Sequence, residues 1–383
     1  MIKVFLTGDN HFGRRYERYP DVKDLLIASR VQSFKKAVEY ANGFGADFFV
    51  VAGDLFDRVS GITREQVSEI VDILSLFEGT ALVLPGNHDY FSGGEQVWKY
   101  FNEECTRAGA DILFLNEYKP LELTVHGETT VFYPAFCRSK HGERNNLGWI
   151  KALKPLKPKE AEVYRIGIAH GAIEGITPDR QKEYFLMTEE ELENIAVDAW
   201  LIGHTHVIYP YALKEDQFLE AGRIFNAGTH EQTDLSNNTD GCCIALELEK
   251  TDGNTHIKAK KVRTGQIRFE DIRLELTAAG REAALESALE GIKEKFTDKS
   301  VVRLTITGAI TADEYNNRRY IYEKYLQKCL SAEIVDDELS ELITREMIRR
   351  EFAETSFAAK LLEELIDEPR EAQMVYDLIS GGA

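Results

Sequence analysis

Cysteine is scarce in this sequence, with five residues and no CxxC spacing. Scattered cysteines in an odd number argue against a disulfide framework and against a zinc knuckle. The sequence also lacks any apolar run near the roughly 20 residues that cross a bilayer. The first residues, MIKVFLTGDN, have neither the basic region nor the apolar region of a signal peptide. We therefore expect a protein of the reducing cytoplasm that does not bind a membrane.

Basic residues are outnumbered, with 46 Lys and Arg against 65 Asp and Glu and a net charge of -19. A protein that grips nucleic acid over its whole surface normally has a basic excess. The charge excludes that class, but it allows a local basic strip or a partner that supplies positive surface. What the chain has is length and aromatic content: 383 residues with 20 Phe and 16 Tyr are enough for two domains.

Strand and helix patterns alternate in the first part of the chain. The apolar runs IKVFLTG, ADFFVVAGD and TALVLPGN are separated by segments with helical spacing, such as ITREQVSEIVDILSLF. This rhythm predicts parallel strands with crossover helices. From about residue 119 short strands dominate, among them YRIGIAHG, AWLIGHTH and GCCIALELE. The second half of the core should therefore be a more β-rich layer packed on the first.

The pattern changes again between Gln266 and Thr277. REAALESALEGIKEKF predicts a helix, SVVRLTITG a strand, and a Tyr-rich helix and acidic amphipathic segments follow. We expect a main domain over 1–275, a small α+β domain over 276–335 and a helical tail over 336–383.

Polar motifs follow five of the predicted strands, where open α/β sheets place their chemistry. They are Asp9-Asn10-His11, Gly53-Asp54, Gly86-Asn87-His88-Asp89, Ala169-His170-Gly171 and Gly203-His204-Thr205-His206. Two neighbouring divalent cations need carboxylates, at least one of them bridging, and neutral imidazole or amide ligands that leave positive charge for a phosphate. The glycines let the backbone turn tightly and a phosphate approach. The predicted ligands of a two-metal phosphoesterase site are Asp9, His11, Asp54, Asn87, His170, His204 and His206.

The order D-x-H, G-D, G-N-H-D, H-G, G-H-x-H resembles that of the calcineurin-like metallophosphoesterase superfamily, over roughly residues 2–250. Within it, the chain resembles the SbcD-type exonucleases of double-strand-break repair, in particular the YhaO-like ones. The resembling features are the GDLFD and VDAWLIGHTH segments and the C-terminal extension, where SVVRLTITG is similar to the start of a capping domain. The resemblance implies a four-layer α/β/β/α sandwich with a small α+β capping domain and a helical tail.

The same resemblance implies a role for each motif residue. One metal would be held by Asp9, His11 and His206, the other by Asn87, His170 and His204, with Asp54 bridging. His88 would lie beside the scissile phosphate, neutralise its charge and protonate the leaving 3′ oxygen, while Asp89 would orient it. The two divalent cations are expected to be Mn²⁺, although the O- and N-rich ligands also tolerate Mg²⁺ and other ions.

Two positions depart from the family pattern. Asp57 stands where some archaeal members have a second active-site histidine, which leaves open how that position would act on DNA. The other is the segment NAGTHEQT, where the family more often has Gly-Ser, and it contains Thr229 and His230. Either residue could face the site, and His230 is equally well explained as a loop residue.

DNA contacts are expected directly after the first motif. Arg14, Arg15 and Arg18 alternate with Tyr16 and Tyr19, a pattern that suits phosphate contacts and base stacking. The alternative is a solvated loop.

Three functions compete for these residues. The first is a DNA exonuclease working with an SbcC-like ATPase, the second a small-molecule phosphodiesterase or phosphatase, and the third a metal-binding scaffold without catalysis. Intact His88 and Asp89 weigh against the scaffold, and the long extension weighs against the small-molecule enzyme. The net charge of -19 weighs against DNA.

Two interfaces are expected as well. A homodimer contact would use apolar residues of two predicted helices, namely Val67, Ile70, Val71, Leu74, Trp98 and Tyr100, unless these face the chain's own sheet. The tail has apolar residues at helical spacing over Leu339–Phe352 and Phe357–Ile366, on otherwise acidic segments. These helices either pack on the core or bind the ATPase.

Overall fold

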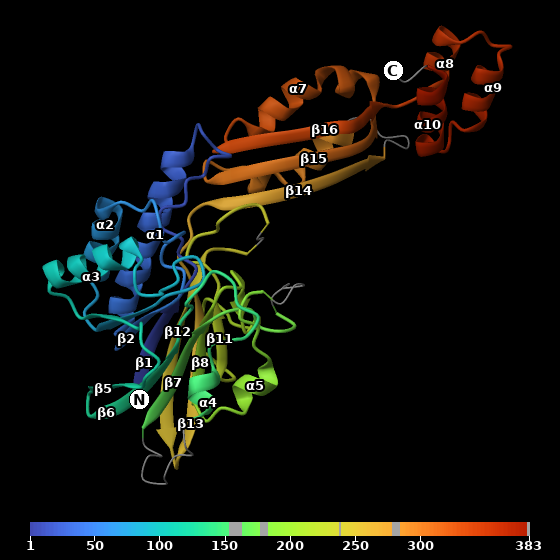
Figure 1. Cartoon of the computed structure of the whole chain (residues 1–383). Coiled ribbons are helices and arrows are strands. Elements are labelled where there is room, and N and C mark those ends of the chain that lie inside the picture. The colour runs from blue at the N-terminus through green and yellow to red at the C-terminus, as the bar shows by residue number, and fades with distance from the viewer. Residues whose placement is uncertain (153–162, 177–182, 237–238, 278–283, 381–383) are drawn as a thin grey trace. The chain divides into compact units, whose positions relative to one another are not determined.

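The computed structural model describes residues 1–152, 163–176, 183–236, 239–277 and 284–380. Within these ranges the chain forms two compact units, Met1–Thr233 with Thr239–Ile267, and Asp234–Asn238 with Arg268–Ala383 (Figure 1). The first part of the helix predicted from REAALESALEGIKEKF, residues 281–283, lies outside the described residues. Among the described residues, no helix combines the length and the apolar character that a membrane crossing requires.

The first unit consists of two sheets and the helices beside them. Its strands are β1 (Ile2–Thr7), β2 (Phe48–Ala52), β3 (Thr80–Leu84), β4 (Ile112–Phe114), β5 (Leu121–Val125), β6 (Glu128–Ala135), β7 (Tyr164–His170), β8 (Ala199–Gly203), β9 (Ile208–Tyr209), β10 (Leu219–Glu220), β11 (Ile224–Ala227), β12 (Cys242–Thr251) and β13 (Asn254–Arg263). Its helices are α1 (Lys23–Phe44), α2 (Arg64–Leu74), α3 (Gln96–Ala108), α4 (Gly148–Lys151) and α5 (Glu189–Glu193). One sheet has the order β10-β13-β12-β1-β2-β3-β4 and the other β5-β6-β7-β8-β11-β9.

Successive side chains of a strand point to opposite faces of the sheet, and this alternation produces the layers of the first unit. In β1, Val4 and Leu6 lie in the apolar cluster between the two sheets, whereas Phe5 lies in the cluster under α1, α2 and α3. The second sheet behaves likewise, because Ile168 faces the first sheet and Trp200 packs with Leu192 of α5. Helices therefore cover the outer face of each sheet (Figure 1). The four-layer α/β/β/α sandwich predicted from the sequence is confirmed.

Parallel pairing gathers the motifs at one edge. Strands β1, β2 and β3 are parallel neighbours, and so are β7 and β8 in the other sheet. The carboxyl ends of parallel neighbours lie together. The five motif segments, each of which ends or follows one of these strands, therefore meet where the two sheets face each other.

Helix α2 begins with a capping box, in which the Thr63 side chain accepts from the backbone of Gln66 and the Gln66 side chain accepts from the backbone of Thr63. Its apolar face packs on its own sheet. Five of the six residues proposed from the sequence for a dimer contact are buried in this core: Val67, Ile70, Val71, Leu74 and Trp98. The sixth, Tyr100, is half-buried and packs against the same core. These side chains pack within their own chain, and the homodimer stays a prediction.

The second unit contains a parallel sheet of order β14-β15-β16. Its elements are β14 (Arg268–Thr277), α6 (Ala284–Glu290), the 3₁₀ helix η2 (Lys293–Lys295), β15 (Ser300–Ile310), α7 (Ala312–Leu326), β16 (Ser331–Glu341), α8 (Arg345–Glu351), α9 (Phe357–Glu364) and α10 (Pro369–Ile379). The domain limits expected at 275/276 and 335/336 fall within β14 and β16. The helix expected from Leu339 to Phe352 is wrong in its first part, because Leu339 belongs to β16 and is buried in the core under α6 and α7.

Candidate metal centre

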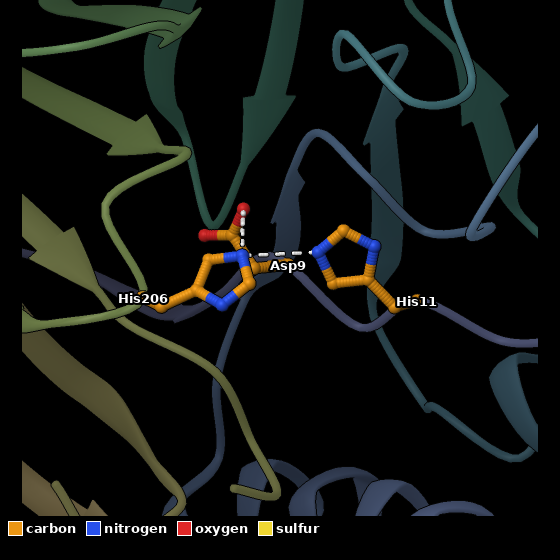
Figure 2. A group of neighbouring side chains, drawn as sticks. All are labelled: Asp9, His11 and His206. Atoms are coloured by element: carbon orange, nitrogen blue, oxygen red, sulfur yellow. Dashed lines mark hydrogen bonds and ion pairs between the residues drawn. The ribbon is translucent and has the colours of Figure 1, made fainter. Parts of the chain in front are cut away.

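Three side chains from two motifs converge at the end of β1. The Nε2 atoms of His11 and His206 lie 3.0 Å apart, and His206 Nε2 lies 3.6 Å from Asp9 Oδ1. Figure 2 shows the two imidazole rings and the carboxylate pointing at one another. Their three donor atoms all lie within 4.8 Å of one another. Nitrogen and carboxylate donors at this spacing match what a divalent transition metal binds.

A second group adjoins the first and shares Asp9 with it. It consists of Asp9, Asp54 and His170, whose donor atoms also lie within 4.8 Å of one another. Asp54 Oδ2 is 3.3 Å from His170 Nε2 and 3.8 Å from His11 Nε2. The Asp54 carboxylate thus lies between the two groups, in the place that a bridging ligand requires.

Asn87 and His204 complete the second group. Asn87 Oδ1 lies 3.0 Å from His170 Nε2 and 3.1 Å from His204 Nδ1. The structure therefore brings together all seven residues predicted from the sequence as ligands. Sequence spacing alone did not show that Asp9 contributes to both groups.

The backbone at the site is strained where the side chains converge. Asp9, His11, Asp54 and His206 have φ of 50°, 48°, 53° and 57°, and His204 has φ of 104°. Left-handed backbone is uncommon for residues other than glycine and is found mainly at functional sites, where the surroundings enforce it. Convergence of these donors is thus imposed by the fold at some cost in stability.

Two glycines make room for this convergence. A Cβ atom at Gly53 would overlap Nδ1 of His170, and one at Gly86 would overlap the carboxylate of Asp54. These glycines were expected to allow tight turns and the approach of a phosphate, and Gly53 does have a left-handed φ of 91°. In the structure their absent side chains admit the neighbouring ligand side chains.

Burial governs the protonation of the site. Burial raises the pKa of Asp9 to about 7, against the opposing charge of His170. Burial also acts to raise the pKa of Asp54, but the charge and hydrogen bond of His170 hold that pKa well below its ordinary value. The pKa of His204 falls to about 3, chiefly because burial disfavours the charged ring. These carboxylates require positive charge next to them to ionise, and divalent cations supply it.

The tautomer of His170 fits a metal ligand. Its Nδ1 lies 2.8 Å from the Ala52 carbonyl oxygen, which can only accept, so Nδ1 carries the proton. Nε2 is then the atom that faces Asp54 and Asn87. Against the effect of burial, the Asp54 carboxylate raises the pKa of His170 to about 9, so that Nε2 holds a proton at neutral pH. A metal ion would take the place of that proton. The donor set fits two divalent cations.

The sequence matches a family model described as calcineurin-like phosphoesterase over residues 2–208, more than half of the chain. This chain belongs to the calcineurin-like phosphoesterase family. The members of that family are metal-dependent hydrolases, in agreement with the converging ligands.

Two solved structures are similar to this phosphoesterase at low identity. One has 12% identity, a TM-score of 0.38, and a match covering 68% of this chain and 98% of its own. The other is a dimetal phosphatase from Danio rerio with 10% identity, the same TM-score of 0.38, and coverage of 69% and 99%. At this low similarity neither structure gives information about the substrate of this chain. A comparison with curated proteins gives no match.

His88 of the phosphoesterase lies beside the first group. Its ring is edge-on to that of His11 at 4.8 Å between centroids, and its backbone N–H donates to Asp54 Oδ1 at 2.8 Å. Its Nδ1 is 3.0 Å from the carbonyl oxygen of Asp57, so Nδ1 must donate. Nε2 is then left for substrate, which agrees with a catalytic role.

Asp89 does not orient His88, contrary to the expectation from the sequence. Its buried carboxylate accepts from the backbone N–H groups of Phe56 at 3.0 Å and Gly86 at 2.6 Å. Burial raises its pKa to about 8. Asp89 thus joins the second and third motif loops, and orientation of His88 comes from the Asp57 carbonyl.

The Asp57 side chain lies next to a predicted ligand, a position that we did not predict from the sequence. Its Oδ1 lies 3.6 Å from His11 Nδ1 and 3.9 Å from Arg14 Nη1. A carboxylate behind a ligating histidine orients the ring and strengthens the ligand. The signal was present in GDLFDR, where a second aspartate follows Asp54 by three residues.

The three arginines after the first motif differ in position. Arg14 reaches Asp57 beside the site, whereas Arg15 is exposed and pairs with Glu17 at 3.7 Å. Arg18 is exposed. Tyr16, expected to be able to stack on a base, is buried, and its hydroxyl accepts from Arg30 at 3.0 Å. Of the residues predicted to contact DNA, Arg14 is the one placed near the donor atoms.

Proposed function

We propose that this phosphoesterase is a metal-dependent DNA nuclease, an SbcD-like exonuclease that acts in DNA repair with an SbcC-type ATPase. The half-exposed His88 beside a complete two-metal donor set supports hydrolysis of a phosphate ester. The GDLFD and VDAWLIGHTH segments and the second folded unit, Arg268–Ala383, point to the nuclease branch of the family.

Different residues of this chain have different roles in the proposed hydrolysis. Two divalent cations, which we propose are Mn²⁺ with Mg²⁺ as an alternative, acidify a water molecule and offset charge on the phosphate when bound. His88, with Nδ1 engaged by the Asp57 carbonyl, offers Nε2 to a phosphoryl oxygen or to the leaving 3′ oxygen. The Asp57 carboxylate lies 3.6 Å from Nδ1 of His11, and Arg14 adds a positive charge next to that carboxylate.

The second candidate is a small-molecule phosphodiesterase or phosphatase that uses the same donors. The net charge of -19 favours it, because an acidic protein repels the DNA backbone. The donor atoms themselves do not distinguish the two functions, since both act on phosphate esters.

A substrate comparison separates these candidates. The full chain is incubated with Mn²⁺ and end-labelled duplex DNA, with labelled single strands, and with bis(p-nitrophenyl) phosphate, each beside an EDTA control. We expect shortening of DNA that stops with EDTA. Hydrolysis of the small ester with intact DNA would instead establish the second candidate, and no hydrolysis of any substrate would favour the scaffold.

The tail helices α8, α9 and α10 are the proposed binding site of the ATPase. They have a small core of their own, which includes Ile348 and Leu362. Four large apolar side chains of the described tail are exposed outside it, with exposed fractions of 79% for Phe357, 66% for Met374, 81% for Leu378 and 37% for Ile379. Exposed apolar residues on helices are typical of a surface that a partner covers. The acidic composition of the tail would complement a basic coiled-coil partner.

A double substitution tests this site without disturbing the core. Phe357→Asp with Leu378→Asp should weaken binding of an SbcC-type ATPase by at least about tenfold, because the two apolar anchors are lost. Hydrolysis of the small ester should stay unchanged. Tyr320→Asp on α7, at a side chain 71% exposed in the same unit, is the matched control. Equal ATPase affinity of all three proteins, measured by titration calorimetry, would rule out the tail.

A further inference from the structure

A run of polar residues after β11 is buried. Thr229, His230, Glu231, Gln232 and Thr233 are all at most 3% exposed. Buried polar groups are unfavourable unless they are hydrogen-bonded, so the partners of such a run show its purpose. This is the NAGTHEQT segment, which departs from the family pattern and contributes no donor to the metal groups.

The partners of this run are in the first metal loop and in α1. Thr229 Oγ1 donates to the backbone oxygen of Asp9 at 2.9 Å. The buried Arg30 guanidinium donates to the Asn10 carbonyl at 2.6 Å and to the Glu231 carbonyl at 2.9 Å. The run is thus attached to the loop in which Asp9 and His11 have left-handed backbone.

The hydrogen bonds of His230 have a fixed direction. Its Nε2 lies 2.8 Å from the Arg30 carbonyl oxygen, which can only accept, so Nε2 carries the proton. Burial and the charge of Arg30 hold the pKa of His230 well below its ordinary value, so the ring is neutral. Nδ1 is then a bare acceptor, and the Asn10 amide nitrogen donates to it at 2.9 Å.

Asn10 is the residue between the two ligands Asp9 and His11. It is fully buried, and its Nδ2 also donates to Thr7 Oγ1 at 3.1 Å. Two acceptors therefore hold the amide, one in β1 and one in the buried run. The His230 ring is itself fixed, because Phe12 and Phe34 pack against it, each at 5.6 Å between ring centroids.

We propose that His230 is a positioning residue for the metal centre. Through Asn10 it fixes the loop that presents Asp9 and His11, and so it sets the affinity for the cation that these residues hold together with His206. The inference rests on the two-metal centre and is independent of whether the substrate is DNA. Removing a residue that positions metal ligands typically lowers metal affinity about 10- to 100-fold. We expect a loss of about this size when the His230 acceptor is removed.

Two substitutions at one position separate the hydrogen bond from the packing. His230→Phe keeps a ring between Phe12 and Phe34 but removes the acceptor for Asn10. His230→Asn places an amide oxygen near the position of Nδ1 and so restores that acceptor. Free Mn²⁺ is measured by electron paramagnetic resonance while metal-free protein is titrated, which reports binding without any substrate.

For His230→Phe we expect one of the two ions to bind about 10 to 100 times more weakly, with a smaller effect on the other. His230→Asn should bind both ions nearly as the unaltered protein does. Unchanged binding by His230→Phe would overturn the proposal. So would equal losses in both variants, because His230→Asn retains the acceptor.

Asn10→Ala supplies a second measurement that does not depend on the folding of His230→Phe. If His230 acts through Asn10, Asn10→Ala should weaken Mn²⁺ binding about as much as His230→Phe does, and the variant combining Asn10→Ala with His230→Phe should bind Mn²⁺ no more weakly than either alone. Additive losses would contradict the proposed route. If the unaltered chain binds Mn²⁺ but cleaves no DNA, the nuclease proposal fails while this inference is still decided by the titration.

Discussion

Asp54→Asn is expected to remove both metal ions and to lower hydrolysis to the level of the EDTA-treated protein. Asp54 Oδ2 lies 3.8 Å from His11 Nε2 and 3.3 Å from His170 Nε2, between the two donor groups. Asparagine keeps the volume and an oxygen for the His88 backbone N–H, but it removes the negative charge that offsets repulsion between two cations. Metal content per chain is measured by atomic absorption after dialysis.

Asp72→Asn is the matched control for this change. Asp72 lies in α2, is exposed and pairs with Arg107, so the same substitution there should leave metal content and activity unchanged. Two ions per chain retained by Asp54→Asn would show that Asp54 does not bridge.

The second large effect is expected for His88→Asn. Its turnover should fall by about 10² to 10⁴-fold, because the general acid is lost. The asparagine amide can still donate to the Asp57 carbonyl in place of Nδ1, so the loop should keep its conformation. Metal content should remain that of the unaltered protein, since His88 is not among the seven predicted ligands.

Turnover is measured on bis(p-nitrophenyl) phosphate and again on a substrate with a better leaving group. If His88 protonates the leaving oxygen, the loss should be smaller for the better leaving group. A loss of bound metal in His88→Asn would instead place His88 among the ligands, which its position near His11 and Asp57 also permits.

The sequence was enough to predict the site residues that follow the ends of strands. Asp9, Asp54 and Asn87 follow three parallel neighbours, β1, β2 and β3, and the alternation of strands and helices predicted that these strands are parallel. The four layers were expected from the resemblance to the family, and in the structure residues such as Phe5 and Leu6 alternate between two apolar environments.

Contacts between loops could not be predicted, because they depend on side chains far apart in the sequence. Asp89 seemed to serve its neighbour His88, yet its carboxylate binds the backbone of Phe56 and Gly86. His230 meets Asn10 across 220 positions. No local spacing encodes such a pair.

The start of the predicted helical tail is wrong. The tail was expected to begin at residue 336, but SAEIVDDELSE, residues 331–341, forms the edge strand β16. Pairing with β15 over Val301–Ile310 and burial of Leu339 under α7 outweigh its local preference. The amphipathic face of α2 shows another limit of sequence patterns. Such a face indicates burial, but it does not show whether the helix packs on the chain's own sheet or on a second copy of the chain.

Anomalous scattering would locate the two divalent cations that these donor atoms are expected to hold. Crystals of the full chain grown with Mn²⁺ would be measured at the manganese absorption edge. We expect two peaks, one between His11 and His206 and the other beside His170, Asn87 and His204, with the Asp54 carboxylate between them. A single peak, or peaks away from Asp54, would show that the donors do not form a two-metal centre.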